Sequence, residues 1–282
     1  MAFDNNRIKG AGTELVTPFS EDGAVDAGAL SRLVNASCEG GMDFLCVLGP
    51  VSEAASLSAE EKKLVRETVA EAAAGRLPLL LGLDAGISPA KFTMMPESSW
   101  DGFDAFLVSA APDEKDVFGY FSDIARFSPL PVFICSDGDG IPSDTVLRLA
   151  EKCHRIAGAV IVSGEGEDIR DILEKRPDGF AVLSGDDSFT CELLLNGADG
   201  AVSAAANAMP ETEWLLVHSL TPEVAMSADM LLRPYVELIA KEGCVTGIKY
   251  MLSKMGIAEN VLREPLRPAS EGLCFDFNLL MK

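Results

Sequence analysis

The chain has 282 residues, of which 48% are hydrophobic and 24% charged, enough to bury the core of one sizeable domain. Its 44 acidic and 23 basic residues give a formal net charge of −21, so nucleic acid and an anionic membrane are excluded as partners by repulsion. Seven cysteines without a C-x-x-C pair, two histidines and no basic and apolar leader argue against a disulfide framework, a histidine metal site and secretion, and we expect a cytoplasmic protein.

Short, nearly continuous apolar runs recur along the chain and predict strands that are buried on both faces. They cover residues 12–19, 44–49, 77–83, 103–110, 131–136, 157–164, 180–185 and 200–205. Amphipathic segments between them predict helices, except at 89–100, which is irregular. The clearest helix is 58–75, with Ser58 as N-cap, Glu61 completing a capping box and Gly75 as C-cap.

Eight strands alternating with helices predict the α/β class and a (β/α)₈ TIM barrel over residues 1–220. A doubly wound open sheet is the alternative, but no G-x-G-x-x-G follows any of the predicted strands. From residue 221 onward the pattern is helical, and we interpret 221–282 as a C-terminal helical extension packed on the barrel. No internal repeat is visible.

In a TIM barrel, function resides at the carboxyl ends of the strands and in the loops that follow them. The side chains predicted to line a pocket there are Thr17, Pro50, Val51, Ser52, Asp84, Ser109, Cys135, Ser163, Asp186 and Ser203. Ser52 and Glu53 are candidate caps for the next helix. Glu14, inside the first strand, faces either the barrel interior or the helix layer, and the sequence does not decide between them.

Four segments carry a resemblance to a known family: "GAGTELVTPFSEDGAVD", "VLGPVSEAASLSAEEKK", "FAVLSGDDSFTCELLLNGADGAVSAAAN" and "VTGIKYMLSKMG". In this order they resemble the dihydrodipicolinate synthase / N-acetylneuraminate lyase family over nearly the whole chain. The resemblance implies a (β/α)₈ class I aldolase, commonly a tetramer. It also implies a carbon–carbon or carbon–oxygen lyase that binds a 2-oxo acid through a Schiff base with a lysine on the sixth strand.

The lysine position of that family is occupied by valine here. The family motif V-G-I-K-E-A-S-G-D aligns with residues 157–165, "AGAVIVSGE", and Val160 falls on the lysine, with the register fixed by Gly158, Ser163 and Gly164. An imine requires a nucleophilic, unprotonated amine. The sequence therefore predicts that the pocket lacks Schiff-base chemistry.

Other positions that the resemblance implies for catalysis also differ. The threonine pair that holds the pyruvoyl carboxylate is Pro50-Val51, and the proton-relay tyrosine of the fifth strand is Cys135. The strand-4 motif T-P-Y-Y reads Ser109 to Pro112, and the loop after Cys135 has no counterpart of the family's arginine. Each change removes a group that the aldolase reaction uses.

Other residues could in principle supply the missing chemistry. Lys115 is the only lysine expected in a loop on the active face, and neighbouring carboxylates would keep it protonated. Lys249 is expected on the surface or at an interface. Acidic residues surround the predicted mouth of the barrel. They are Asp84, Asp113, Glu114, Asp116, Asp137, Asp139, Glu165, Glu167, Asp186 and Asp187. A divalent cation bound by some of these carboxylates is one hypothesis, and the default interpretation is that they are solvated loop charges. We therefore expect no metal site.

Two functions remain open. In the first, the chain keeps the family's fold, has lost pyruvate Schiff-base activity, and acts as a small-molecule-binding or regulatory and structural homologue. In the alternative, it is a lyase- or aldolase-like enzyme with altered, metal-assisted or other, chemistry on a neutral, cationic or 2-oxo-acid-related substrate. No cofactor is expected, and the expected partners are a small molecule and further copies of the chain in a dimer or tetramer.

Overall fold

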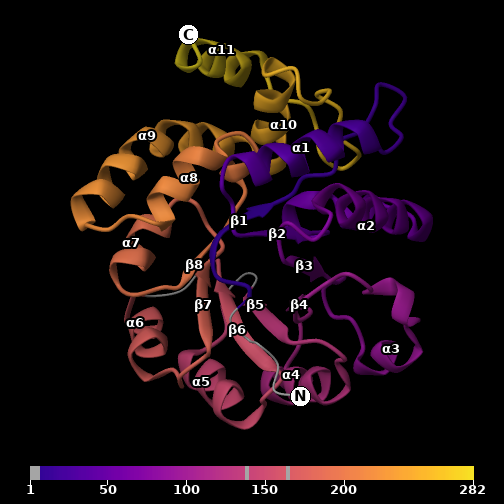
Figure 1. The fold of residues 1–282 in the computed structure, drawn as a ribbon, viewed down its shortest axis with the longest axis vertical. Coiled ribbons are helices and arrows are strands. Elements are labelled where there is room, and N and C mark those ends of the chain that lie inside the picture. Colours follow the sequence, from indigo (N-terminus) through magenta and orange to yellow (C-terminus); the bar gives the residue numbers. More distant parts are fainter. Residues whose placement is uncertain (1–6, 137–139, 163–165) are drawn as a thin grey trace.

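The computed structural model describes residues 7–136, 140–162 and 166–282. Within these ranges eight parallel strands close into a barrel in sequence order, and β8 pairs with β1 (Figure 1). The strands are β1 (Gly10–Glu14), β2 (Phe44–Val47), β3 (Leu79–Gly82), β4 (Ala105–Ser109), β5 (Val132–Ser136), β6 (Ile156–Ile161), β7 (Ala181–Ser184) and β8 (Gly200–Ser203). The predicted TIM barrel is confirmed.

Helices surround the barrel, as Figure 1 shows. They are α1 (Ala27–Glu39), α2 (Ala59–Ala73), α3 (Pro89–Met94), α4 (Val117–Phe127), α5 (Ser143–Lys152), α6 (Gly166–Lys175), α7 (Thr190–Leu195) and α8 (Pro210–Val217). Short 3₁₀ turns interrupt the loops at η1 (Pro50–Ser52), η2 (Ala54–Ser56), η3 (Glu97–Ser99) and η4 (Ala205–Asn207). The segment 89–100, predicted to be irregular, holds α3 and η3.

The first strand lies earlier than the apolar run 12–19 predicts, because burial continues after the strand has ended. Leu15, Val16 and Phe19 are all buried although they follow β1. The Val16 amide donates to Asn207 Oδ1 at 3.1 Å instead of to a neighbouring strand. A side chain from η4 therefore satisfies the backbone where the sheet stops.

Helix α2 begins as predicted and ends one residue earlier. Ser58 accepts from the Glu61 amide, and the Glu61 side chain accepts from the Ser58 amide, which completes the predicted capping box. The C-cap is Ala74, in the left-handed conformation with φ of 49°, and Gly75 follows it with φ of 73°. The glycine next to the cap signalled the end of the helix without being the cap itself.

Two apolar layers build the core. The barrel interior is filled by side chains that alternate along the strands, among them Phe44, Leu107, Phe133, Val160 and Leu183. A larger layer lies between the strands and the surrounding helices. The alternation follows from the period of two residues in a strand, which turns every second side chain inward.

The C-terminal helices extend the same core. They are α9 (Pro222–Lys241), α10 (Cys244–Lys254) and α11 (Glu271–Leu280), seen in orange and yellow in Figure 1. Leu232, Val236 and Ile239 of α9 belong to the layer between strands and helices. In the part of the chain that the structure describes, no helix combines the length and apolarity that a membrane crossing requires.

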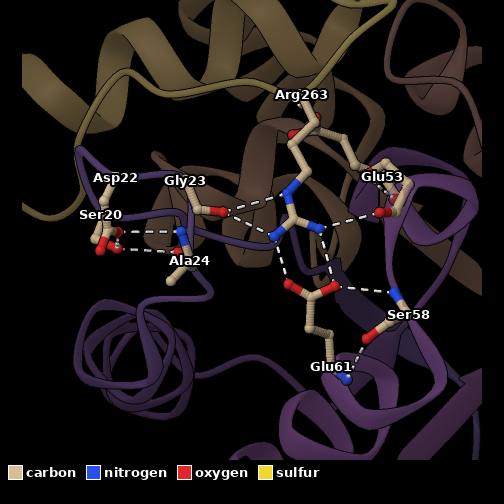
Figure 2. A network of polar contacts seen from close by, with 9 residues as sticks. Ser20, Asp22, Gly23, Ala24, Glu53, Ser58, Glu61 and Arg263 are labelled. Carbon is tan, nitrogen blue, oxygen red and sulfur yellow. Dashed lines mark hydrogen bonds and ion pairs between the residues drawn. The ribbon is translucent and has the colours of Figure 1, made fainter.

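Arg263 joins three parts of the molecule that are distant in sequence (Figure 2). Its guanidinium donates to the Gly23 carbonyl at 2.7 Å and pairs with Glu61, whose carboxylate also accepts from the Ser58 amide. The Arg263 backbone amide donates to Glu53 at 2.9 Å. The segment before α11 thereby holds both the loop after β1 and the start of α2.

Candidate functional site

A cavity of about 330 Å³ lies at the carboxyl ends of the strands. Residues of the barrel and of the C-terminal helices line it: Glu14, Pro50, Val51, Leu107, Cys135, Val160, Val162, Gly185, Asp186, Asp187, Ser188, Val202, Ala204, Val236, Ile239, Ala240 and Cys244. Helices α9 and α10 thus complete a pocket that the strands begin. We call it the central cavity.

Val160 forms part of the apolar wall of the central cavity. It sits on β6, in register with Cys135 on β5 and Leu183 on β7, and only 2% of it is exposed. Strand alternation turns Val160 to the barrel interior, while Ala159 joins the outer layer. A hydrocarbon branch therefore occupies the wall at this position.

Glu14 faces the barrel interior, which answers the orientation that the sequence left open. Its carboxylate lines the central cavity and accepts from the Val51 amide at 3.1 Å. A Cβ at position 49 would come within 2.6 Å of Glu14 Oε1, so Gly49 is required for this close approach. Glu14 also raises the pKa of the Cys46 thiol, adding to the larger effect of burial.

Asp187 is a carboxylate with a raised pKa that lines the central cavity. Its Oδ2 accepts from the Ala205 amide at 2.8 Å, whereas its buried Oδ1 has no hydrogen-bond partner among the described residues. Burial raises the pKa of Asp187 to about 6, and the neighbouring charge of Asp186 adds to the rise. Such an acid changes its protonation state near neutral pH.

Behind Asp187 lies a second buried carboxyl, Glu213 of α8, which is 1% exposed. Burial raises the pKa of Glu213 well above its usual value, and the charge of Asp187 raises it further. The Ser203 hydroxyl interacts with both carboxyl groups and opposes both shifts. One hydroxyl carries a single proton, so it can satisfy only one of the two at a time.

The Cys244 thiol at the cavity is not activated. Burial, followed by the charges of Asp187, Asp186 and Glu14, raises the pKa of Cys244 to about 11. Cys135 is buried, 2% exposed, at the end of β5. A nucleophilic cysteine needs a neighbouring positive charge, and the residues described as lining the central cavity supply none.

The loop after β2 is held in a strained path beside the central cavity. Leu48 and Glu53 are both left-handed, with φ of 58° and 56°. Ser52 donates its hydroxyl to the Gly49 carbonyl at 2.5 Å, and Glu53 pairs with Lys249. The cap of α2 is Ser58, so the prediction that Ser52 and Glu53 cap this helix is wrong.

A second cavity, of about 570 Å³, adjoins the first and shares Pro50 and Leu107 with it. Asp84, Ser109 and Lys62 contribute to its lining. Lys62, from the first turn of α2, forms an ion pair with Asp84 at 2.5 Å. Lys62 was not predicted at the site because the sequence places it in a helix and not in a loop, but a long side chain near a helix start also reaches the rim.

Lys249 is buried, 1% exposed, so the expectation of a surface or interface position is wrong. Its ammonium pairs with Glu53, donates to the Val261 carbonyl at 2.8 Å, and lies 4.0 Å from the centroid of the Phe19 ring. Burial lowers the pKa of Lys249 to about 8. The amine is nevertheless absent from the described lining of both cavities.

The predicted pocket residues fall into three groups. Those lining the central cavity are Pro50, Val51, Cys135, Val160 and Asp186, and those lining the adjoining one are Pro50, Asp84 and Ser109. Thr17, Ser52 and Ser203 are buried and are not among the described residues that line either cavity. Ser163 lies outside the described residues.

Some carboxylates of the metal hypothesis also lie outside the described residues. The structure does not describe Asp137, Asp139 and Glu165, nor the side chain of Glu167. Among the residues that it does describe, no group of three or more His, Cys, Asp or Glu side chains is arranged to hold a metal ion.

Comparison with known proteins identifies the fold's relatives. The model of the dihydrodipicolinate synthetase family matches residues 7–276. The chain belongs to this family. It is 34% identical over 273 residues to the 4-hydroxy-tetrahydrodipicolinate synthase of Phocaeicola vulgatus, covering 93% of this chain and 92% of the relative. It is 32% identical over 275 residues to that of Salinibacter ruber, with 94% and 91% covered.

Solved structures of the family superpose closely. The synthase of Methylacidiphilum fumariolicum SolV gives a TM-score of 0.90 at 28% identity, with 97% of this chain and 95% of that chain covered. The synthase of Acinetobacter baumannii, solved with pyruvate, gives 0.90 at 26% identity, with 97% and 98% covered. The C-terminal helices are thus part of the shared family fold.

Proposed function

We propose that this member of the dihydrodipicolinate synthetase family does not form a Schiff base with pyruvate or a related 2-oxo acid. It acts as a small-molecule-binding homologue, regulatory or structural in role, whose binding site is the central cavity. Family membership supports the fold, and the residues that line the cavity support the proposed chemistry.

The observation that carries the proposal is Val160 in the wall of the central cavity. A class I aldolase needs a lysine amine at the carbonyl carbon of its substrate, and the resemblance assigns that amine to position 160. An isopropyl group offers no lone pair and no proton, so no imine can form there.

Neither nearby lysine supports an imine in its place. Lys62 lines the adjoining cavity, where its amine is engaged by Asp84. Lys249 has the lowered pKa that imine chemistry requires, but Glu53 and the Val261 carbonyl hold its nitrogen in the core. Low pKa without access to substrate gives no catalysis.

Among the described residues that line the central cavity, no cationic side chain is present to bind the carboxylate of a 2-oxo acid. Pro50 and Val51 stand where the family places hydroxyl groups, and no lysine or arginine is among the residues described as lining the central cavity. Glu14, Asp186 and Asp187 line it instead. An anionic substrate is therefore repelled.

A second candidate function is an enzyme with altered chemistry, a lyase or aldolase that works without the imine. One observation favours it: Asp187, with a pKa of about 6, could hold or release a proton at the cavity near neutral pH.

We also propose that the chain is cytoplasmic and forms a homo-oligomer, as the resemblance implies. A monomeric dihydrodipicolinate synthase variant shares the fold, with a TM-score of 0.91, so the fold alone does not require assembly.

Borohydride trapping tests the proposal. The chain is incubated with pyruvate, reduced with sodium borohydride and weighed intact by mass spectrometry. We expect the mass of the untreated chain, because no accessible amine meets the ketone. An added reduced pyruvate on the wild-type chain would contradict the proposal, and peptide mapping would identify the lysine.

Two variants show that the cavity admits pyruvate. Val160→Lys places an amine at the family position and offsets part of the negative charge of the cavity, so this variant is expected to gain an adduct. Val162→Lys, a neighbouring cavity residue, is the matched control for charge and burial. Lys62→Met and Lys249→Met report on the two lysines if the wild-type chain reacts.

A further inference from the structure

At the end of the barrel opposite the central cavity, three aspartates repeat one arrangement. Asp43, Asp104 and Asp199 each stand directly before a strand, β2, β4 and β8 respectively. The backbone amide of each aspartate donates to a carbonyl of the preceding strand, and its carboxylate accepts from the amide of that same residue. In order, the partners are Ala11, Leu79 and Val182, with amide–carboxylate distances of 2.7, 2.9 and 2.8 Å. We call these reciprocal pairs the aspartate clamps.

A basic side chain completes each aspartate clamp. Arg7 pairs with the aspartate of the β3–β4 clamp, and Arg176 pairs with that of the β7–β8 clamp. A guanidinium stays charged at every pH that a folded protein meets. In the β1–β2 clamp the partner is His218, whose Nε2 lies 3.2 Å from Asp43 Oδ2. Because a histidine changes its charge between pH 5 and 8, only this one of the three clamps can switch near neutral pH.

The orientation of the His218 ring requires its charged form. Nε2 faces Asp43 Oδ2 at 3.2 Å, and Nδ1 faces the Trp214 carbonyl oxygen at 3.1 Å. A carboxylate and a carbonyl oxygen only accept hydrogen bonds, so both ring nitrogens have to donate. The imidazolium carries two N–H groups, whereas the neutral ring carries one and turns a lone pair toward one of these oxygens. Loss of the proton therefore breaks one of the two contacts.

The surroundings of the ring on α8 favour a positive charge. His218 is the C-cap residue of this helix, where the negative end of the helix dipole lies. The ring stacks on the Trp214 indole, with centroids 4.6 Å apart and planes at 15°, and the face of an indole attracts cations. The acidic residues of α8, Glu211 and Glu213, lie in its first turn, at the other end of the helix. About a third of the His218 side chain is exposed, 33%, so the ring exchanges its proton with solvent.

The charges of the adjoining clamp are already matched. The β7–β8 clamp lies next to the β1–β2 clamp, because the Gly10 amide donates to the Asp199 carbonyl at 2.9 Å. The Asp199 carboxylate pairs with Arg176, and Lys9 lies 3.6 Å from it. Asp43 is therefore the carboxylate that responds to the charge of the histidine ring.

The β1–β2 clamp closes a surface on which α8 already packs. A Cβ on Gly40 would come within 2.6 Å of Pro210 at the start of α8, and one on Gly41 within 3.3 Å of Trp214. The turn between α1 and β2 thus lies along the helix, and His218 fixes the end of the helix to the same segment. Because α8 leads into α9, which lines the central cavity, the clamp secures the base of one cavity wall.

We propose that His218 and Asp43 form a pH-sensitive clamp, which ties the end of α8 to the starts of β1 and β2 while the ring is charged and opens when the ring becomes neutral. The clamp adds to the stability of the fold at a pH below the range in which a histidine titrates. That contribution is lost as the pH rises through the range. The inference does not depend on the proposed function, and no covalent step is involved.

A double-mutant cycle at two pH values tests the clamp. His218→Phe keeps a ring on Trp214 but has no N–H group, and Asp43→Asn keeps an oxygen for the Ala11 amide. Urea unfolding is measured for the wild-type chain, both single variants and the double variant. At pH 5.5 the double variant is expected to raise the unfolding equilibrium constant about fivefold less than the product of the two single effects. At pH 8.5 the double effect is expected to equal that product.

Two controls separate the clamp from general effects of pH. Arg176→Gln and Asp199→Asn form the matched cycle in the β7–β8 clamp, and their coupling is expected to be the same at pH 5.5 and 8.5 because a guanidinium does not titrate there. His154→Phe removes the second histidine of the chain, which is exposed, and is expected to change stability equally at both pH values.

Hydrogen exchange of the wild-type chain tests the same opening without a variant. The His218 amide donates to the Trp214 carbonyl at 2.9 Å, and the Ser128 amide at the end of α4 donates to Ile124 at the same distance. Protection of the His218 amide is expected to fall about fivefold relative to that of Ser128 between pH 5.5 and 8.5.

Four results would overturn the inference. They are no coupling between positions 43 and 218 at pH 5.5, equal coupling there at both pH values, an equal loss of coupling in the β7–β8 clamp, or a constant ratio of protection between His218 and Ser128. None of these measurements involves pyruvate, so the borohydride result decides the proposed function separately.

Discussion

At the scale of single residues, Asp187 is a buried carboxyl group whose ionisation lowers the stability of the fold. Its pKa is raised to about 6, chiefly by burial, in the company of Asp186, Glu213, Ser203 and the Cys244 thiol. An acid whose pKa is higher in the folded than in the unfolded chain destabilises the fold once it is ionised. Residues with this property are characteristic of functional sites.

The raised pKa of Asp187 leads to a stability prediction. Asp187→Asn removes the buried charge and is expected to stabilise the chain by about 1–3 kcal/mol at pH 7 to 8. The advantage shrinks as the pH falls below about 6, where the wild-type carboxyl also becomes neutral. Urea unfolding of both chains between pH 4 and 8 measures it, with the exposed Asp144→Asn as control. A variant that is less stable at pH 8 would contradict the cost assigned to Asp187.

Val160 and Lys249 show how far residues can be placed from sequence. Strand alternation put Val160 inside the barrel, because in a strand of known register only two directions exist. Lys249 needed the tertiary structure: Glu53, Val261 and Phe19 surround it from distant parts of the chain. An amphipathic pattern assigns a lysine to solvent by default, and only a buried partner reverses that.

At the scale of elements, the loop between β2 and α2 is fixed from outside the barrel. Glu53 pairs with Lys249 of α10. It also accepts from the Arg263 backbone amide, and the Arg263 side chain pairs with Glu61 at the start of α2 (Figure 2). The left-handed backbone conformations of Leu48 and Glu53 are tolerated because these contacts fix the path of the loop. The C-terminal segment therefore shapes one wall of the central cavity.

A second stability prediction belongs to this network. The hydrogen bond from Arg263 is the largest cause that lowers the pKa of Glu61 to about 2. An acid with a lowered folded pKa stabilises the chain above its unfolded pKa and loses that effect as the pH falls toward 2. Glu61→Gln keeps the capping oxygen and is expected to cost about 1 kcal/mol at pH 7, since the pair is partly exposed.

Unfolding curves measured between pH 3 and 7 check this prediction. The difference in unfolding free energy between wild type and Glu61→Gln should narrow toward pH 3. Glu60→Gln, one residue earlier on α2 and exposed, is the matched control with no expected change. A constant gap across this range would show that the charge of Glu61 contributes nothing.

At the scale of the whole molecule, the barrel could be predicted because every strand is a short apolar run and nearly every connection is amphipathic. Boundaries were less certain: β1 ends at Glu14 although the apolar run continues to Phe19, since burial by α1 and η4 resembles burial in a sheet. The cavity lining contributed by α9 and α10 could not be predicted, because it depends on how the C-terminal helices cross the mouth.

We propose that this chain keeps the dihydrodipicolinate synthetase fold without its imine chemistry. Proton exchange on pyruvate tests this most directly, because an imine interconverts with an enamine and exchanges the methyl protons even when no second substrate is present. Pyruvate in D₂O is followed by NMR with the wild-type chain and with buffer alone. We expect equal rates. Faster exchange with the wild-type chain, abolished by borohydride treatment in the presence of pyruvate, would contradict the account.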